Sequence, residues 1–265
     1  MLKLSVSNIA WVAANDGEVF SAMRDLGFEG LEIAPTRVFP ETPYDRCPEA
    51  GVFAKKIKDD YGFTIPSMQS IWYGRKENIF SGEEDRDTLK DYTEKAILFA
   101  KKIGCKNLVF GCPKNRIVPE GVDPKAANGF FKAIGDYANL NGTVVGMEAN
   151  PTIYGTNFIN TNASALKLIE EVESEGFKLN LDVGTMVENG EDISVLKGHA
   201  ELINHVHISE PNLVPIQKRK LHSKLNEFLR EEGYEGFVSI EMKTTDDVDG
   251  LKRIMEYVVS VFGER

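Results

Sequence analysis

Short apolar runs recur along the chain and end in glycine, proline or polar residues, a pattern typical of strands. The first run alternates in polarity and then becomes continuously apolar. A later run, over residues 143–147, stops abruptly at a carboxylate. Eight strands are expected in all, at residues 2–9, 28–34, 64–72, 106–111, 143–147, 177–183, 202–208 and 237–242.

Between these runs, apolar residues return at helical spacing. The clearest case is residues 87–103, where Leu89, Ala96 and Phe99 fall on one apolar face of the expected helix. Gly104 is expected to end this helix. Eight helices are expected, at residues 16–26, 50–61, 87–103, 124–140, 162–173, 193–199, 220–232 and 248–262. Two polar stretches are expected to be long loops, at residues 35–48 and 73–85, and such loops often carry function.

The order of these elements predicts the fold. Strands alternate with helices through the whole chain, and the strands read as near-continuous apolar runs, which is typical of a parallel sheet buried on both faces. An α/β fold of the (β/α)8 TIM-barrel type fits best, with residues 1–265 as one domain. A doubly wound open sheet is the alternative, but no GxGxxG or GxxxxGK[ST] motif follows the first run to support nucleotide binding.

Four residues of metal-binding type stand near the C-terminal ends of the last four predicted strands: Glu148, Asp182, His207 and Glu241. Successive members are 34, 25 and 34 residues apart, which suits one strand and one crossover helix each time. The C-terminal strand ends of a barrel meet at one face, where active sites lie. We therefore expect these four side chains to converge.

Three carboxylates and an imidazole left unpaired would each cost several kcal/mol, so a divalent cation is expected among them. Any one of them could instead be a solvated or salt-bridged group, but four on successive strands favour a metal site. The oxygen-rich set suits Mn²⁺ best, with Mg²⁺, Co²⁺ or Zn²⁺ as alternatives. Such a metal could stabilise an enediolate, while Glu148 and Glu241 remove and return the proton next to a carbonyl.

Charge and cysteine content narrow the classes of protein. The net charge is −10 with dispersed acidic residues, which argues against nucleic acid as a partner. Cys47, Cys105 and Cys112 form no CxxC pair, so the reducing cytoplasm is the expected location. No apolar run approaches the ~20 residues of a membrane span, so no membrane partner is expected.

The motifs around the four residues resemble those of the xylose isomerase-like TIM barrel superfamily. Predicted strand seven carries His-x-His-x-x-Glu (His205, His207, Glu210), and strand eight ends in Ile-Glu. Within the superfamily the chain is most similar to the sugar phosphate isomerase/epimerase branch, which includes ketose 3-epimerases, hydroxypyruvate isomerase and inosose dehydratase. The resemblance implies a sugar isomerase or epimerase, often a homodimer or homotetramer, with the four residues as ligands and Glu148 and Glu241 as the acid/base pair.

The chain departs from the ketose epimerases at three positions. Thr185 stands in place of a substrate-binding His, Tyr154 in place of a second Glu, and Leu213 in place of an Arg. Basic residues in the predicted loops after strands four and eight could bind the substrate instead: Lys114, Arg116 and Lys243. They would suit a phosphorylated or acidic sugar.

Other candidates for substrate contact lie near the C-terminal ends of predicted strands: Trp11, Glu32, Gln69, Trp72 and Glu210. The two tryptophans suit the wall of a sugar pocket and the core equally well. His205, two residues before His207 on the same strand face, is expected to hydrogen-bond behind the ligands rather than bind the cation.

Three other functions remain open. An inosose-type dehydratase would use the same metal and bases but expel a hydroxyl group. An endonuclease IV-like DNA repair enzyme would need more histidines at the site, whereas His199 and His222 are expected on helix surfaces. A non-catalytic sugar-binding barrel is the third alternative, although all four ligand residues are present.

Overall fold

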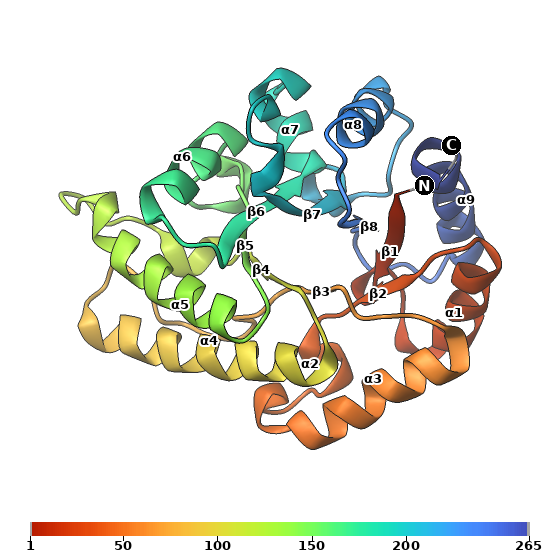
Figure 1. Cartoon of the computed structure of the whole chain (residues 1–265), viewed down its shortest axis with the longest axis horizontal. Helices are drawn as coiled ribbons and strands as arrows, with labels where there is room; N and C mark the ends of the chain where they lie inside the picture. Colours follow the sequence, from red (N-terminus) through yellow and green to blue (C-terminus); the bar gives the residue numbers. More distant parts are fainter. Residues whose placement is uncertain (1, 264–265) are drawn as a thin grey trace.

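The computed structural model describes residues 2–263, with eight parallel strands at the centre and helices around them (Figure 1). The strands are β1 (Lys3–Ser7), β2 (Gly30–Glu32), β3 (Ser67–Met68), β4 (Asn107–Phe110), β5 (Val145–Met147), β6 (Phe177–Asp182), β7 (Ile203–Ile208) and β8 (Phe237–Ile240). Their order is β2-β1-β8-β7-β6-β5-β4-β3, and isolated bridges join β2 to the β3 segment, so the barrel is nearly closed. The prediction of a (β/α)8 barrel is confirmed. Met1, Glu264 and Arg265, which the expected domain includes, lie outside the described residues.

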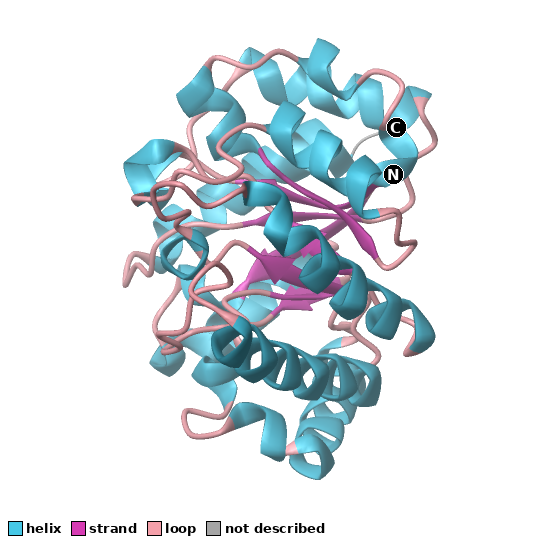
Figure 2. Cartoon of the chain, turned by 90° about the vertical axis from the view of Figure 1, so that its left-hand side faces the viewer, coloured by secondary structure: helices cyan, strands magenta, loops and turns pink. Residues whose placement is uncertain are grey.

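The helices cover the outer face of the strands, as the side view shows (Figure 2). They are α1 (Asp16–Asp25), α2 (Pro35–Val38), α3 (Cys47–Tyr61), α4 (Glu83–Ile103), α5 (Asn128–Leu140), α6 (Asn162–Val172), α7 (Val183–Asn189), α8 (Lys220–Glu231) and α9 (Val248–Val258). Within residues 2–263, none of them is both long and apolar enough to cross a membrane.

Several predicted elements differ from the structure. The strand expected at residues 64–72 shrinks to β3, because Pro66 has no N–H to donate and Ser70 turns the chain at a φ of 54°. The helix expected at residues 193–199 is a 3-10 turn, Ile193–Leu196, whereas the unpredicted α7 begins directly after Asp182. The expected loop at residues 35–48 contains α2, a 3-10 turn and the start of α3.

The strands alternate in polarity, contrary to the near-continuous apolar pattern that we expected. Apolar side chains such as Val6 and Val206 are fully buried on the outer face, toward the helices. Polar side chains face the barrel interior, where Asn107 donates hydrogen bonds to Ser67 (3.0 Å) and Asn180 (3.2 Å). Gly146 belongs to this interior, since a Cβ there would lie 2.5 Å from Oδ1 of Asn107. The barrel core is therefore a polar network that continues up to the strand ends.

Candidate functional site

The four predicted ligands converge at the C-terminal end of the barrel. One ligand atom from each of Glu148, Asp182, His207 and Glu241 lies within 4.8 Å of the others. Glu148 directly follows β5 and Glu241 directly follows β8, while Asp182 ends β6 and His207 lies within β7. Each is at most 8% exposed. The strand register alone brings these distant residues together.

Polar contacts hold the Glu148 carboxylate from both sides. Oε1 accepts a hydrogen bond from Nδ2 of Asn180 at 2.8 Å, and Oε2 accepts one from Nδ2 of Asn150 at 3.2 Å. Arg116 lies behind this pair, where Nη2 donates to Oδ1 of Asn150 at 2.7 Å and to the Glu148 carbonyl at 3.0 Å. Arg116 is fully buried, and burial lowers its pKa to about 10. Its guanidinium therefore positions Asn150 and Glu148.

The Asp182 carboxylate has two protein donors. Oδ1 accepts the backbone N–H of Thr185 at 2.6 Å, as the N-cap of α7, and Oδ2 accepts the hydroxyl of Ser209. The Thr185 hydroxyl donates to the Ala149 carbonyl at 2.8 Å. Thr185 thus links the start of α7 to Asp182 and to the segment after β5. It is not among the residues that line the pocket.

His207 lies between acidic groups on both sides of its ring. Its Nδ1 is 3.1 Å from Oε1 of Glu148 and 3.2 Å from Oε2 of Glu241, while Nε2 is 2.9 Å from Oε2 of Glu32. Nε2 of His205 lies 2.9 Å from the same Glu32 oxygen. A proton on Nε2 that is donated to Glu32 would leave Nδ1 free to bind a cation.

The electrostatics of the cluster fit a bound divalent cation. Burial, and after it the charges of neighbouring carboxylates, raise the pKa of Asp182 to about 6 and that of Glu241 to about 7. Burial opposes a charge on His207, yet Glu32, Glu241 and Glu148 together raise its pKa well above the ordinary value. Three crowded carboxylates and one imidazole nitrogen are hard or borderline ligands, and a cation would compensate their repulsion.

The ligands open into a pocket of about 200 Å³. Glu148, Asp182 and Glu241 are among the residues that line it. The remaining lining residues are uncharged: Gln69, Ser70, Val109, Gly111, Cys112, Pro113, Asn150, Tyr154 and Leu213. A volume below the usual range for drug-sized ligands suits one small molecule.

The predicted basic residues do not line this pocket. Lys114 and Lys243 are exposed, and Arg116 is buried beneath Asn150. Glu210, another predicted contact, is held by the Arg219 guanidinium, whose Nε lies 2.7 Å from its Oε1. The structure therefore brings Gln69 to the pocket but places these four residues elsewhere.

The predicted aromatic and acidic contacts also lie away from the pocket. Trp11 is 1% exposed and donates to Asp16, and Trp72 is 2% exposed and donates to Thr93. Glu32 is fully buried behind His207. His222, which we expected on a helix surface, is fully buried because it faces Tyr257 and Phe262, so that prediction is wrong.

Sequence reasoning missed three residues that hold the ligands: Asn150, Asn180 and Ser209. Strand alternation could have revealed Asn180, since it precedes Asp182 by two residues and shares its strand face. The other two lie beyond the strand ends, where no local pattern predicts which way a side chain points.

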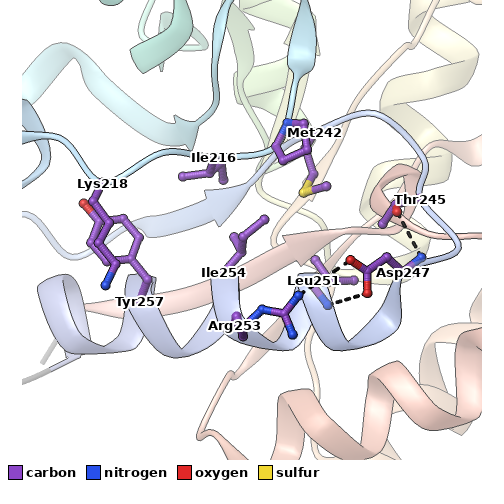
Figure 3. A pocket seen from close by; sticks show the side chains of 11 residues that line it. Ile216, Lys218, Met242, Thr245, Asp247, Leu251, Arg253, Ile254 and Tyr257 are labelled. Atoms are coloured by element: carbon purple, nitrogen blue, oxygen red, sulfur yellow. Dashed lines mark hydrogen bonds and ion pairs between the residues drawn. The ribbon is translucent and has the colours of Figure 1, made fainter.

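A second hollow of about 350 Å³ lies outside the barrel mouth, between α9 and residues 215–218 (Figure 3). Ile216, Met242 and Ile254 form an apolar floor. Asp247 is the acidic residue that lines this hollow. Its carboxylate accepts the Gly250 N–H at 2.8 Å and pairs with Arg253. This hollow has no cluster of free acids, so the pocket above the four ligands is the candidate active site.

The structure thus defines a (β/α)8 barrel with a buried carboxylate–histidine cluster at its catalytic face. The family model described as "Xylose isomerase-like TIM barrel" matches residues 20–260, and the chain belongs to that family. This confirms the resemblance found in the sequence. Comparison with curated proteins gives no significant match.

Several solved structures share this fold. The 3-keto-D-glucoside 4-epimerase of E. coli has a TM-score of 0.73 at 20% identity, with 98% of this chain and 100% of that chain covered. D-Psicose 3-epimerase from Clostridium cellulolyticum H10 has a TM-score of 0.78 at 16% identity, covering 98% and 99%. A family 2 AP endonuclease from Brucella melitensis has a TM-score of 0.73 at 20% identity, with 97% of this chain and 99% of that chain covered. At these identities the likenesses establish the fold alone.

Proposed function

We propose that the protein is a divalent-metal-dependent isomerase or epimerase of an uncharged sugar. The observation that carries this proposal is the convergence of Glu148, Asp182, His207 and Glu241 into one cluster, whose three carboxylates line one small pocket. Structural neighbours named as epimerases of psicose and of a keto-glucoside support the sugar class. Mn²⁺ is the proposed metal, since three carboxylates and one imidazole suit it.

The lining of the pocket favours an uncharged substrate over a sugar phosphate or sugar acid. Phosphate and carboxylate groups are normally bound by Arg or Lys, and neither type lines the pocket. Three carboxylates against one divalent cation leave the site negative, which would repel an anion. The loop lysines Lys114 and Lys243 remain available for other contacts on the surface.

The two glutamates are suited to opposite steps of a proton transfer. Glu148 follows β5 and Glu241 follows β8, with His207 between them, so they approach a bound substrate from different directions. One carboxylate accepts the proton from the carbon beside the carbonyl, and the other delivers a proton to the product. A bound cation would favour the ionised form of both carboxylates, which is the form that accepts a proton. A bound cation supplies Lewis acidity for the charge that develops on the substrate oxygens.

An activity on DNA, as the AP endonuclease neighbour would suggest, is less well supported. The net charge is −10, and within residues 2–263 no Lys or Arg lines the pocket to bind a phosphate backbone. A dehydratase would use the same acid and base, so product analysis must separate it from an isomerase.

The test is incorporation of solvent deuterium into a panel of ketoses, keto-glycosides and sugar phosphates with Mn²⁺ present, read by mass spectrometry. We expect deuterium at one carbon of an uncharged sugar, without loss of water from the product. Exchange restricted to sugar phosphates would overturn the substrate class. No exchange by metal-loaded protein, or a dehydrated product, would overturn the isomerase function.

Variants separate metal binding from proton transfer. Glu148→Gln and Glu241→Gln should abolish exchange at any Mn²⁺ concentration, because an amide cannot carry the proton. Asp182→Asn should lose activity at low Mn²⁺ but regain part of it at saturation, because Asp182 binds the metal without moving a proton. Equal behaviour of all three variants would contradict the assigned roles.

A further inference from the structure

Tyr154 forms part of the pocket wall. It ends the 3-10 turn Thr152–Tyr154 in the loop after β5 and is half-buried. It lines the pocket together with Glu148, Asp182 and Glu241. No other phenol is among the residues that line this pocket.

The Tyr154 hydroxyl accepts a hydrogen bond but donates none to the protein. The backbone N–H of Asn212 donates to its oxygen at 2.9 Å, and no acceptor for its own hydrogen lies within residues 2–263. Burial, followed by the charge of Asp182, raises its pKa to about 12, so the phenol keeps its proton at neutral pH. The pocket therefore contains an O–H donor with no protein acceptor.

The other polar amide and hydroxyl side chains of the pocket already donate within the protein. Nε2 of Gln69 donates to Ser7 at 2.7 Å, and the Ser70 hydroxyl donates to Oε1 of Gln69 at 2.9 Å. Asn150 donates to Glu148 and to the Ala149 carbonyl. Because the carboxylates only accept and Ser70 already donates, Tyr154 is the hydroxyl among the described pocket residues that is left to donate to a substrate oxygen without a hydrogen.

The loop after β7 fixes the position of this donor. Asn212 and Leu213 have φ values of 59° and 54°, a left-handed conformation that a leucine adopts only when its surroundings hold it. The Leu213 carbonyl accepts the Lys243 N–H at 2.8 Å, and its N–H donates to the Glu210 carbonyl at 2.8 Å. These contacts keep the Leu213 side chain at the pocket beside Tyr154.

We propose that Tyr154 contacts the substrate and donates its hydroxyl hydrogen to a carbonyl or ring oxygen of an uncharged sugar, while Leu213 covers the adjacent C–H face of the sugar. This inference rests on the proposed function for the class of substrate. It assigns hydroxyl recognition to the carboxylates of the pocket and recognition of a hydrogen-free oxygen to Tyr154.

The test compares Tyr154→Phe with Tyr257→Phe. Tyr257 is a matched control because its oxygen accepts the Arg219 N–H at 3.1 Å, so it also anchors the segment between β7 and α8. It lines the second hollow (Figure 3) and is not among the residues that line the candidate active site. D-Fructose and D-tagatose serve as probes, and their binding to Mn²⁺-loaded protein is measured by calorimetry in a Glu241→Gln background without turnover. Thermal unfolding of each variant checks that it is folded.

We expect Tyr154→Phe to weaken binding of the preferred ketose about tenfold and Tyr257→Phe to leave it unchanged. In protein with active Glu241, KM for deuterium exchange should rise with a smaller change in kcat. If Tyr154→Phe binds the ketose as tightly as its parent does, the contact between Tyr154 and the substrate is overturned while the proposed function stands. If Tyr154→Phe and Tyr257→Phe weaken ketose binding equally, the effect comes from anchoring of the loop, and the contact is overturned as well. Failure of the metal-loaded parent to exchange any ketose or keto-glycoside of the panel would overturn the proposed function itself, and the inference with it.

Discussion

Nε2 of His207 lies 2.9 Å from Oε2 of Glu32, on the opposite side of the ring from the pocket. Both side chains are fully buried, so water does not compete for this contact. The Glu32 charge thus selects the tautomer in which Nδ1 can bind a cation, and Glu32 acts behind His207 rather than on a substrate.

Glu32→Gln should weaken Mn²⁺ binding by at least about tenfold, because the amide retains the shape but loses the charge that orients His207. The dissociation constant can be measured by calorimetric titration of metal-free protein. Glu210→Gln is the control, since it also removes a buried carboxylate but one that pairs with Arg219 away from the pocket. Equal affinities for Glu32→Gln and the parent protein would contradict the positioning role.

Binding of the metal should stabilise the fold. A cation at 100 times its dissociation constant adds about 2.7 kcal/mol, because it binds the folded state alone. Thermal unfolding with MnCl₂ should therefore give a higher Tm than unfolding with a chelator. Asp182→Asn should lose most of this increase, since it removes one ligand from the cluster. A Tm that does not respond to metal in the parent protein would count against the site.

Gly111 leaves room for the Glu148 carboxylate. A Cβ at this position would lie 2.8 Å from Oε2 of Glu148, so Gly111→Ala should displace the carboxylate and lower Mn²⁺ affinity about tenfold or more. Metal titration checks this. Gly129→Ala on α5 is the control, since an added Cβ there meets no atom within 4 Å. Unchanged affinity in Gly111→Ala would show that Glu148 can move without loss of binding.

The stability of the protein should fall in mild acid because of His222. Burial lowers its pKa to about 4, and Nδ1 lies 2.9 Å from the Tyr257 hydroxyl. Between pH 6.5 and 4 the unfolded chain therefore binds a proton that the folded protein excludes. The resulting stability is complete above pH 6.5 and is lost as the pH falls toward 4, a change on the order of 1–3 kcal/mol.

Urea unfolding at pH 7.5 and pH 5 measures this change. His222→Asn can keep a hydrogen bond to Tyr257 but cannot titrate, so its loss of stability between the two pH values should be smaller than that of the parent. If both proteins lose the same free energy of unfolding, His222 is not the responsible group.

The fold could be predicted because its determinants are local. Each apolar run and each helical stripe is visible within about ten residues, and their strict alternation leaves few possible topologies. The short β3 and the unpredicted α7 could not be seen in this way. The first depends on a left-handed turn at Ser70, and the second on an N-cap that the ligand Asp182 itself provides.

The sequence by itself determined the four residues of the carboxylate–histidine cluster, because a strand end is a local feature and parallel strands place their ends at one face. Only the tertiary structure decided which other residues act there. Glu32 and His207 are 175 positions apart, and Arg116 turns beneath Asn150 instead of into the pocket. Tyr154 becomes a pocket residue through a backbone N–H from another loop. Side-chain direction beyond a strand end follows from packing and hydrogen bonds between distant segments, which no local pattern records.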